Sequence, residues 1–446
     1  MMKIDKQTLK DLEVFRSDEN TTTLFDFIDR TKTTGGSYCL RQKFLNPPGT
    51  FNQLKKQQEA VHFFSEMGNS SNLELPYNSN QMKSLEEYIS SNINVVENGN
   101  LITCAMFCLF DIEAYRYIKN SLKEIIDFIY TFHKTIDHKG NRNSFLLSKI
   151  NDDINNLIND PDFKEAVRLK NNNKLLFYRV LQLDRIFRTR LKNTFQDLIG
   201  WYYEVDALLS MAKTTLENNF SYPEITDEED SIFRVEGLYH PLLQNAIPYD
   251  ISLDGDSNLV FLTGPNMAGK TTFLKAAGTA VYLAHLGMGI PAKSARISYL
   301  ERLFASLNIT DSITTGYSFF YSEVKRVKQL AESLNRGEKV FSLFDELFRG
   351  TNVKDAYDAS VMIISGLVRW NRSIFILSSH LWELWEKIKV FPNIKELCFE
   401  SEIKNGKPVF TYHILQGVSD MRLGMTIIEN EKIMDLLNSN ETFIPA

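Results

Sequence analysis

The clearest chemical pattern in the chain is a glycine-rich run at residues 264–271, Gly-Pro-Asn-Met-Ala-Gly-Lys-Thr. Its spacing is that of a phosphate-binding loop, in which Gly264 and Gly269 let backbone N–H groups approach a polyphosphate closely. Lys270 would supply a positive charge to the β- and γ-phosphates, and Thr271 a hydroxyl ligand for Mg²⁺. The run therefore predicts a site for a nucleoside triphosphate with magnesium.

Polar residues follow two further apolar runs. Asp345 and Glu346 come directly after residues 339–344, and His380 follows residues 373–378 in a Ser-Ser-His triplet. Beside a phosphate loop, Asp345 would hold Mg²⁺ through the water shell of the ion, and Glu346 would orient and polarise the attacking water. The imidazole of His380, if neutral, could reach the γ-phosphate. This order of residues predicts triphosphate hydrolysis.

These residues need a sheet to bring them together. Apolar runs at 259–263, 339–344 and 373–378 alternate with helix-prone segments, and a hairpin pattern joins 397–403 to 408–414 around Asn405-Gly406. That alternation predicts an α/β domain with a mostly parallel central sheet and an antiparallel edge. Residues 1 to about 225 repeat apolar side chains at helical spacing and predict an almost entirely helical region. The acidic stretch 223–230 is interpreted as a linker between the two.

Composition narrows the class of protein. Of 446 residues, 43% are hydrophobic and 24% charged, which is typical of a globular protein. Neither a signal peptide nor an apolar run of membrane-spanning length is found, and four cysteines are consistent with reduced thiols. We therefore expect a cytoplasmic protein that makes no membrane contact.

The net charge of −6 gives no global sign of nucleic-acid binding, but residues 164–192 are locally basic. Arg185, Arg188 and Lys192 fall on one helical face. Two interpretations stay open, a solvated helix face or a contact with a DNA phosphate backbone.

Several motifs together resemble the MutS family of DNA mismatch repair proteins, a branch of the ABC-type ATPases. Residues 263–272 resemble its phosphate loop, and residues 345–352, Asp-Glu-Leu-Phe-Arg-Gly-Thr-Asn, resemble its Asp-Glu-x-x-Arg-Gly-Thr motif. Residues 316–323, Gly-Tyr-Ser-Phe-Phe-Tyr-Ser-Glu, correspond to its signature segment, with Phe319 and Tyr321 as departures. Upstream, residues 29–47 resemble the start of the family's helical core, and residues 206–212 its returning lever helix.

The resemblance implies a multidomain α plus α/β protein. It implies a helical core over residues 1–110, lever helices over 111–228 and an ABC-type P-loop ATPase domain over 229–446. It implies a Mg²⁺-dependent ATPase that works as a homodimer, in which Ser318 contacts the γ-phosphate bound to the other subunit. Family position places residues 247–249, Ile-Pro-Tyr, on one side of the adenine and Tyr412 on the other, although Tyr412 could equally be a core residue on a strand face.

The resemblance implies a role for each site residue. The catalytic set is Lys270, Glu346, His380 and Ser318, and the metal ligands are Thr271 and Asp345. The ATP-binding set is Gly264, Pro265, Asn266, Met267, Ala268, Gly269, Lys270, Thr271, Thr272, Ile247 and Tyr412.

The resemblance also implies partners, namely DNA and repair or recombination proteins. The helical core begins almost at residue 1, so we expect no N-terminal mismatch-recognition domain and a reduced or missing clamp. Two functions are consistent with these features. One is an ATP-switched dimer that acts on DNA, and the other is a nucleotide-gated protein-interaction scaffold that does not bind DNA.

Overall fold

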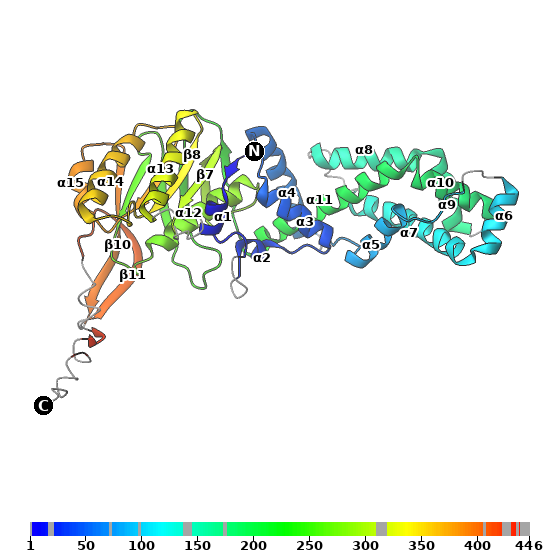
Figure 1. Cartoon of the computed structure of the whole chain (residues 1–446), viewed down its shortest axis with the longest axis horizontal. Helices are drawn as coiled ribbons and strands as arrows, with labels where there is room; N and C mark the ends of the chain where they lie inside the picture. Colours follow the sequence, from blue (N-terminus) through cyan, green and yellow to red (C-terminus); the bar gives the residue numbers. More distant parts are fainter. Residues whose placement is uncertain are drawn as a thin grey trace. The chain divides into compact units, whose positions relative to one another are not determined.

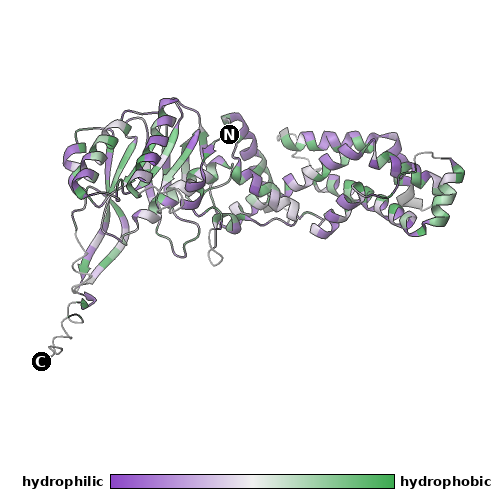
Figure 2. Cartoon of the chain, in the orientation of Figure 1, coloured by the Kyte–Doolittle hydropathy of each residue, from purple (hydrophilic) through white to green (hydrophobic). Residues whose placement is uncertain are grey.

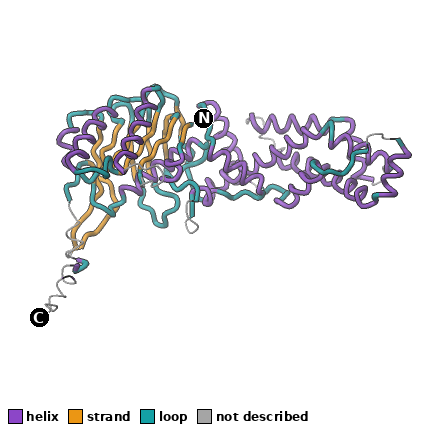
Figure 3. The backbone as a smooth tube through the Cα atoms, in the orientation of Figure 1, coloured by secondary structure: helices purple, strands orange, loops and turns teal. Residues whose placement is uncertain are grey.

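The computed structural model describes residues 2–16, 22–70, 74–96, 100–136, 145–172, 176–308, 319–404, 407–421, 430–433 and 437. The chain forms two compact units. An α/β unit comprises Met1–Phe27, Asn46–Leu54 and Glu217–Ala446, and a helical unit comprises Ile28–Leu45 and Lys55–Leu216. All the described strands lie in the α/β unit (Figure 3). The mixed composition of helical and α/β parts agrees with the sequence prediction.

Between residues 24 and 217 every described element is a helix, as the apolar spacing predicts. These helices are α2 (Leu24–Ile28), α3 (Thr34–Leu45), α4 (Phe51–Ser70), α5 (Ser79–Ile89), α6 (Leu101–Phe110), α7 (Ile112–Ile136), α8 (Phe145–Asn159), α9 (Pro161–Asn172), α10 (Phe177–Arg188) and α11 (Lys192–Glu217). Most have one apolar and one polar face, seen as alternating colours along each ribbon (Figure 2). In α7 the buried residues include Ile118, Leu122, Ile125, Ile129 and Phe132, the three- and four-residue spacing of a stripe facing a core.

The main sheet of the α/β unit has seven strands in the order β1-β7-β8-β9-β5-β10-β11. The first six run parallel, and β11 pairs antiparallel to β10 as the edge hairpin. Their bounds are β1 (Lys3–Ile4), β5 (Leu259–Thr263), β7 (Arg302–Ser306), β8 (Val340–Asp345), β9 (Ile374–Ser378), β10 (Ile394–Lys404) and β11 (Lys407–Gln416). The mostly parallel sheet is therefore confirmed.

Helices cover both faces of this sheet (Figure 1). Successive side chains of β8 point to opposite faces. Phe344 packs in a buried cluster with α13 (Phe319–Asn335), α14 (Val353–Leu367) and α15 (Trp385–Ile388). Leu343 points to the other face and packs against α12 (Lys270–His285). A Cβ added at Gly278 of that helix would lie 2.7 Å from Cδ1 of Leu343. The buried strands β5, β8 and β9 thus hold their carboxyl ends in fixed positions.

A second sheet of four strands has the order β2-β6-β3-β4. Its strands are β2 (Glu224–Thr226), β3 (Phe233–Leu238), β4 (Tyr249–Leu253) and β6 (Ser294–Ser298). Burial alternates along β3 and β4, as expected for a sheet with one face toward the core. β4 matters for the site, because Tyr249 begins it.

The structure corrects two boundaries predicted from sequence. The N-terminal residues are not part of the helical unit, because Lys3 and Ile4 pair with β7 and the side chain of Asp11 accepts hydrogen bonds from Leu307 N and Asn308 N at 2.9 and 3.2 Å. The predicted linker 223–230 contains β2, so the α/β unit begins near Glu217 rather than at 229. Both errors arise from pairing between distant segments. None of the described helices is long and apolar enough to cross a membrane.

Candidate functional site

The glycine-rich loop joins β5 to α12, as predicted. Gly264 has a φ of 142° and Gly269 a φ of 108°, backbone conformations that L side chains rarely adopt. A Cβ on Gly264 would lie only 3.1 Å from Cβ of Phe399, so the loop also passes close to β10. Gly269 is the N-cap of α12, which directs the first N–H groups of that helix toward the loop.

Lys270 lies at the base of the loop and is 6% exposed. Its Nζ donates to the carbonyl oxygens of Gly264 and Pro265 at 2.5 and 3.2 Å. Burial lowers the pKa of Lys270, and the nearby Glu346 and Asp345 carboxylates oppose that shift. A buried ammonium of this kind is well placed to bind an anion, since a phosphate would replace the solvation that burial removes.

Asp345 ends β8 beside the start of α12. Its Oδ2 accepts a hydrogen bond from the Thr271 hydroxyl at 2.6 Å, and its Oδ1 accepts one from Ser378 at the end of β9. Two oxygen ligands in one octahedral Mg²⁺ shell lie roughly 2.9 Å apart. The Thr271–Asp345 pair therefore fits a magnesium ion in both ligand type and spacing.

Glu346 follows Asp345 with its backbone in the left-handed region, at a φ of 63°. Its Oε2 lies 3.1 Å from His380 Nδ1 and 3.1 Å from Arg349 Nε. Burial raises the pKa of Glu346, but the His380 hydrogen bond and the Arg349 charge outweigh it, so the pKa falls below 4.5. The hydrogen bond to Glu346 raises the pKa of His380 above 6.5.

The sign of each shift gives the pH window of this pair. The ionised Glu346 carboxylate stabilises the folded protein above pH 4.5, and this stabilisation is lost as the pH falls through its lowered pKa. The protonated His380 imidazole stabilises the folded protein below pH 6.5, and this stabilisation is lost as the pH rises through its raised pKa. The carboxylate–imidazolium pair is therefore complete between those values, and the exposed His380 loses its charge only as the pH rises through its raised pKa.

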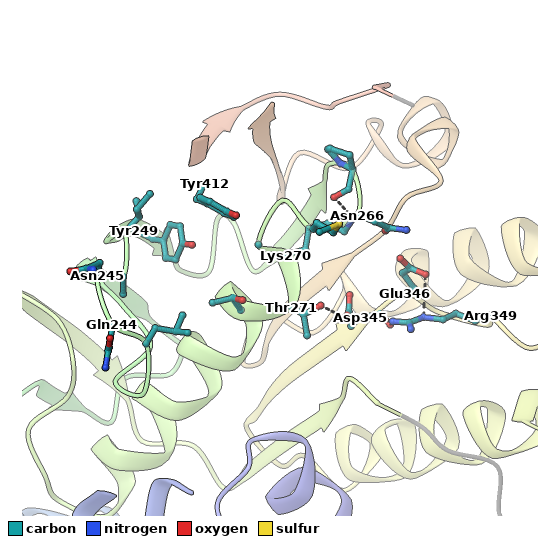
Figure 4. A pocket seen from close by; sticks show the side chains of 17 residues that line it. Gln244, Asn245, Tyr249, Asn266, Lys270, Thr271, Asp345, Glu346, Arg349 and Tyr412 are labelled. Atoms are coloured by element: carbon teal, nitrogen blue, oxygen red, sulfur yellow. Dashed lines mark hydrogen bonds and ion pairs between the residues drawn. The ribbon is translucent and has the colours of Figure 1, made fainter. Parts of the chain in front are cut away.

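One cavity of about 940 Å³ is lined by Lys270, by the Thr271–Asp345 pair and by Glu346 (Figure 4). Asp345, Glu346 and Arg349 lie at one end of the view, and Tyr249 and Tyr412 at the other. Tyr249 is held by edge-to-face contacts with Phe273 and Phe399, at centroid distances of 5.3 and 6.0 Å. The lining residues are Leu243, Gln244, Asn245, Ala246, Ile247, Tyr249, Pro265, Asn266, Met267, Gly269, Lys270, Thr271, Thr272, Asp345, Glu346, Arg349 and Tyr412.

Most of the predicted site residues thus share one cavity. Ile247 and Tyr412 both line it, and Tyr412 is 42% exposed with a φ of 59°, which does not suit the core interpretation. Gly264 and Ala268 shape the loop without lining the cavity, and His380 contacts Glu346 from outside it. The predicted Ser318 lies outside the described residues.

Sequence reasoning assigned no role to several residues at the site. Arg349 lay inside the quoted Asp-Glu-x-x-Arg-Gly-Thr motif, and Ser378 inside the Ser-Ser-His triplet, so a signal was present for both. Leu243, Gln244 and Asn245 come from the loop before β4 and carry no pattern that would reveal them.

One residue of the predicted basic face, Arg188, is buried in the helical unit. Arg188 is 6% exposed, and its guanidinium donates to both carboxylate oxygens of Asp184, at 2.8 and 2.5 Å, and to the carbonyl of Ile93 at 2.7 Å. It is a buried structural residue, since helical spacing shows which residues share a face but not which way that face points. Arg185 is exposed and Lys192 half-buried, so both remain candidates for a DNA contact.

Comparison with known proteins agrees with this architecture. The family model "MutS domain III" matches residues 7–214, and the model "MutS domain V" matches residues 260–438. The chain is 31% identical over 255 residues to a DNA mismatch repair protein MutS of Ehrlichia ruminantium (strain Gardel), covering 54% of this chain and 31% of that protein.

Two further relatives carry the same name. That of Wolbachia pipientis wMel is 30% identical over 227 residues, covering 50% of this chain and 26% of the relative. That of Clostridium kluyveri (strain ATCC 8527) is 30% identical over 271 residues, covering 57% and 30%. The matches span less than a third of these curated relatives. Two models of one family together match most of the residues of this chain. The chain therefore belongs to the MutS family.

Proposed function

We propose that this chain is a Mg²⁺-dependent ATPase built on an ABC-type domain. The observation that carries the proposal is the 2.6 Å hydrogen bond between Thr271 and Asp345 in the cavity that also holds Lys270 and Glu346. The cavity offers an anion site, a magnesium site and a carboxylate base in one place, with a tyrosine wall for the adenine.

Each residue has a distinct part in the proposed hydrolysis. Lys270 and the N–H groups of the loop bind the β- and γ-phosphates, and the ion at Thr271 and Asp345 neutralises phosphate charge when bound. Glu346 orients a water and accepts its proton as the water oxygen bonds to the γ-phosphorus. The bond from that phosphorus to the β,γ-bridging oxygen breaks, leaving ADP and phosphate. His380 and Arg349 keep Glu346 ionised and hold its carboxylate in position. Their contacts with Oε2, each 3.1 Å long, support this role.

The names of the relatives support a proposal for the wider function. They are named DNA mismatch repair proteins, and we propose that this chain likewise acts on DNA as a dimer whose conformation changes with the nucleotide. Ser318 of the partner subunit would complete each ATP site. A γ-phosphate contact supplied across an interface exists only when two subunits meet, which would couple ATP binding to closure.

Phosphate release and molar mass test this proposal together. The purified protein is expected to release phosphate from ATP with Mg²⁺ and not with EDTA, and light scattering is expected to give twice the chain mass when ATP is present. No phosphate release above a buffer blank would reject the ATPase. A mass of one chain at every ATP concentration would reject the dimer.

DNA binding is tested through the two remaining basic candidates. The double substitution Arg185→Glu and Lys192→Glu is expected to weaken duplex DNA binding about tenfold or more and to reduce the salt slope by about two, since each phosphate contact contributes about one. Binding is measured by fluorescence anisotropy from low to physiological salt. Lys83→Glu serves as the control, because this exposed residue of α5 also lies in the helical unit.

A second function, a nucleotide-gated scaffold that does not bind DNA, has an observation in its favour. Two arginines of the basic stretch are paired with acids, since Arg190 bonds Asp160 and Asp162 at 2.8 and 2.5 Å and Arg179 lies 3.5 Å from Glu165. ATP hydrolysis with near-millimolar DNA affinity and no salt dependence would favour the scaffold over the DNA-acting dimer.

A further inference from the structure

Glu323, in the second turn of α13, has no assigned role, yet its carboxylate makes two unusual contacts. It is 5% exposed, and it faces the turn that follows β8 rather than solvent. Its Oε1 accepts the backbone N–H of Arg349 and its Oε2 that of Gly350, each at 3.1 Å. A buried carboxylate that spends both oxygens on two consecutive N–H groups fixes the position and the plane of that peptide segment.

The segment held in this way is strained. Glu346 and Phe348 have φ values of 63° and 62°, a left-handed conformation that non-glycine residues keep only when their surroundings impose it. One end of the segment is fixed by the hydrogen bond from Glu346 N to Ser378 O at 3.0 Å. Glu323 fixes the other end through Arg349 and Gly350.

Packing closes the same junction. A Cβ added to Gly350 would lie 2.5 Å from the backbone N of Phe320, so α13 and the turn touch at backbone distance. The rings of Phe320 and Phe348 lie 5.8 Å apart. The first two turns of α13 are thus the surface on which the turn 346–350 is built.

We infer that Glu323 is a positioning residue that sets the aim of the base Glu346 through the backbone of the turn. The inference rests on the proposed ATPase function and adds a residue to it. Glu323 is not one of the described residues that line the cavity. Its effect on the nucleotide would therefore be indirect. Without it, the turn can relax toward the β region, which swings the Glu346 carboxylate away from His380 and from the water it must orient.

The test is steady-state and single-turnover ATP hydrolysis by Glu323→Gln. The amide oxygen can accept one N–H, but the amide nitrogen is a donor and would face the second. We expect kcat to fall about 10- to 100-fold, as a small misplacement of a catalytic group does. ATP affinity, measured with a fluorescent ATP analogue, is expected to stay within about twofold, because ground-state binding is untouched. A residue needed only for folding would not separate kcat from affinity.

Two other variants frame the result. Glu332→Gln makes the same chemical change on the exposed side of α13, where Glu332 pairs weakly with Lys328 at 3.8 Å, and is expected to leave both constants unchanged. Gly350→Ala pushes the turn off α13 without altering Glu323, and is expected to lower kcat as Glu323→Gln does. It also replaces Glu323→Gln if that variant does not fold.

The outcomes are separable from the wider proposal. An inactive parent protein would overturn the ATPase proposal itself. An active parent whose Glu323→Gln and Gly350→Ala variants keep full kcat would overturn the positioning role alone. Equal losses of kcat and affinity in both variants would also overturn it, because they would show general damage to the site.

Discussion

Glu346→Gln is expected to abolish most ATP turnover while leaving ATP binding intact. A positioned general base contributes about 100- to 10,000-fold to the rate, and glutamine cannot accept the proton of the attacking water. The substitution preserves size and keeps an oxygen near Arg349 and His380. Phosphate release under single-turnover conditions gives the rate, and the fluorescent ATP analogue gives the affinity.

A matched surface variant separates the chemistry from a general loss of charge. Glu386 lies in α15 with a side chain 61% exposed and paired to Lys389 at 2.6 Å, so Glu386→Gln is expected to behave as the parent protein does. Because hydrolysis ends the ATP-bound state, Glu346→Gln is also expected to prolong the lifetime of the proposed dimer, as measured by light scattering. A variant that hydrolyses ATP within about threefold of the parent rate would show that another group activates the water.

The local parts of the site could be predicted from the sequence with some precision. The strand 259–263 matches β5 residue for residue, and the strands before Asp345 and His380 are displaced by one residue or less at each end. These strands are buried on both faces, so they appear as continuous apolar runs, and the glycine-rich loop between β5 and α12 has its own spacing. Chemistry that depends on such local patterns is accessible without a structure.

What could not be predicted depends on contacts between distant residues. β1 has only two residues, Lys3 and Ile4, and exists because β7 offers it an edge. The burial of Arg188 depends on Asp184 and on the carbonyl of Ile93, and helical spacing cannot indicate which face turns inward. Periodicity describes an element, whereas the neighbours of that element come from the fold.

The turn after β8 shows a third kind of limit. The Asp-Glu-x-x-Arg-Gly-Thr motif indicated which residues gather there, but not that Glu346 would adopt a left-handed φ of 63°. Nor does any spacing rule join Glu323 to Arg349, 26 positions later. Strained backbone at a functional site is held by the surrounding structure, so it becomes visible only once that structure is known.

The second large effect is expected for Lys270→Met, which should weaken ATP binding about 100-fold. The ammonium is buried beneath the loop, 2.5 Å from the carbonyl of Gly264, where a phosphate would receive a charge-assisted hydrogen bond in a poorly solvated place. Such a bond is worth up to about 3 kcal/mol, and each 1.4 kcal/mol changes a binding constant about tenfold. Methionine is unbranched and only one atom shorter than lysine, and it removes the charge and the donors.

The same helix provides the control for this substitution. Lys275 also lies in α12, but its Nζ bonds Glu13 at 2.7 Å, and it does not line the cavity among the described residues. Lys275→Met is therefore expected to bind the fluorescent ATP analogue within about twofold of the parent, since it leaves the phosphate site intact. If the two variants bind ATP equally well, the loop charge does not hold the phosphates, and the triphosphate assignment of this cavity fails with it.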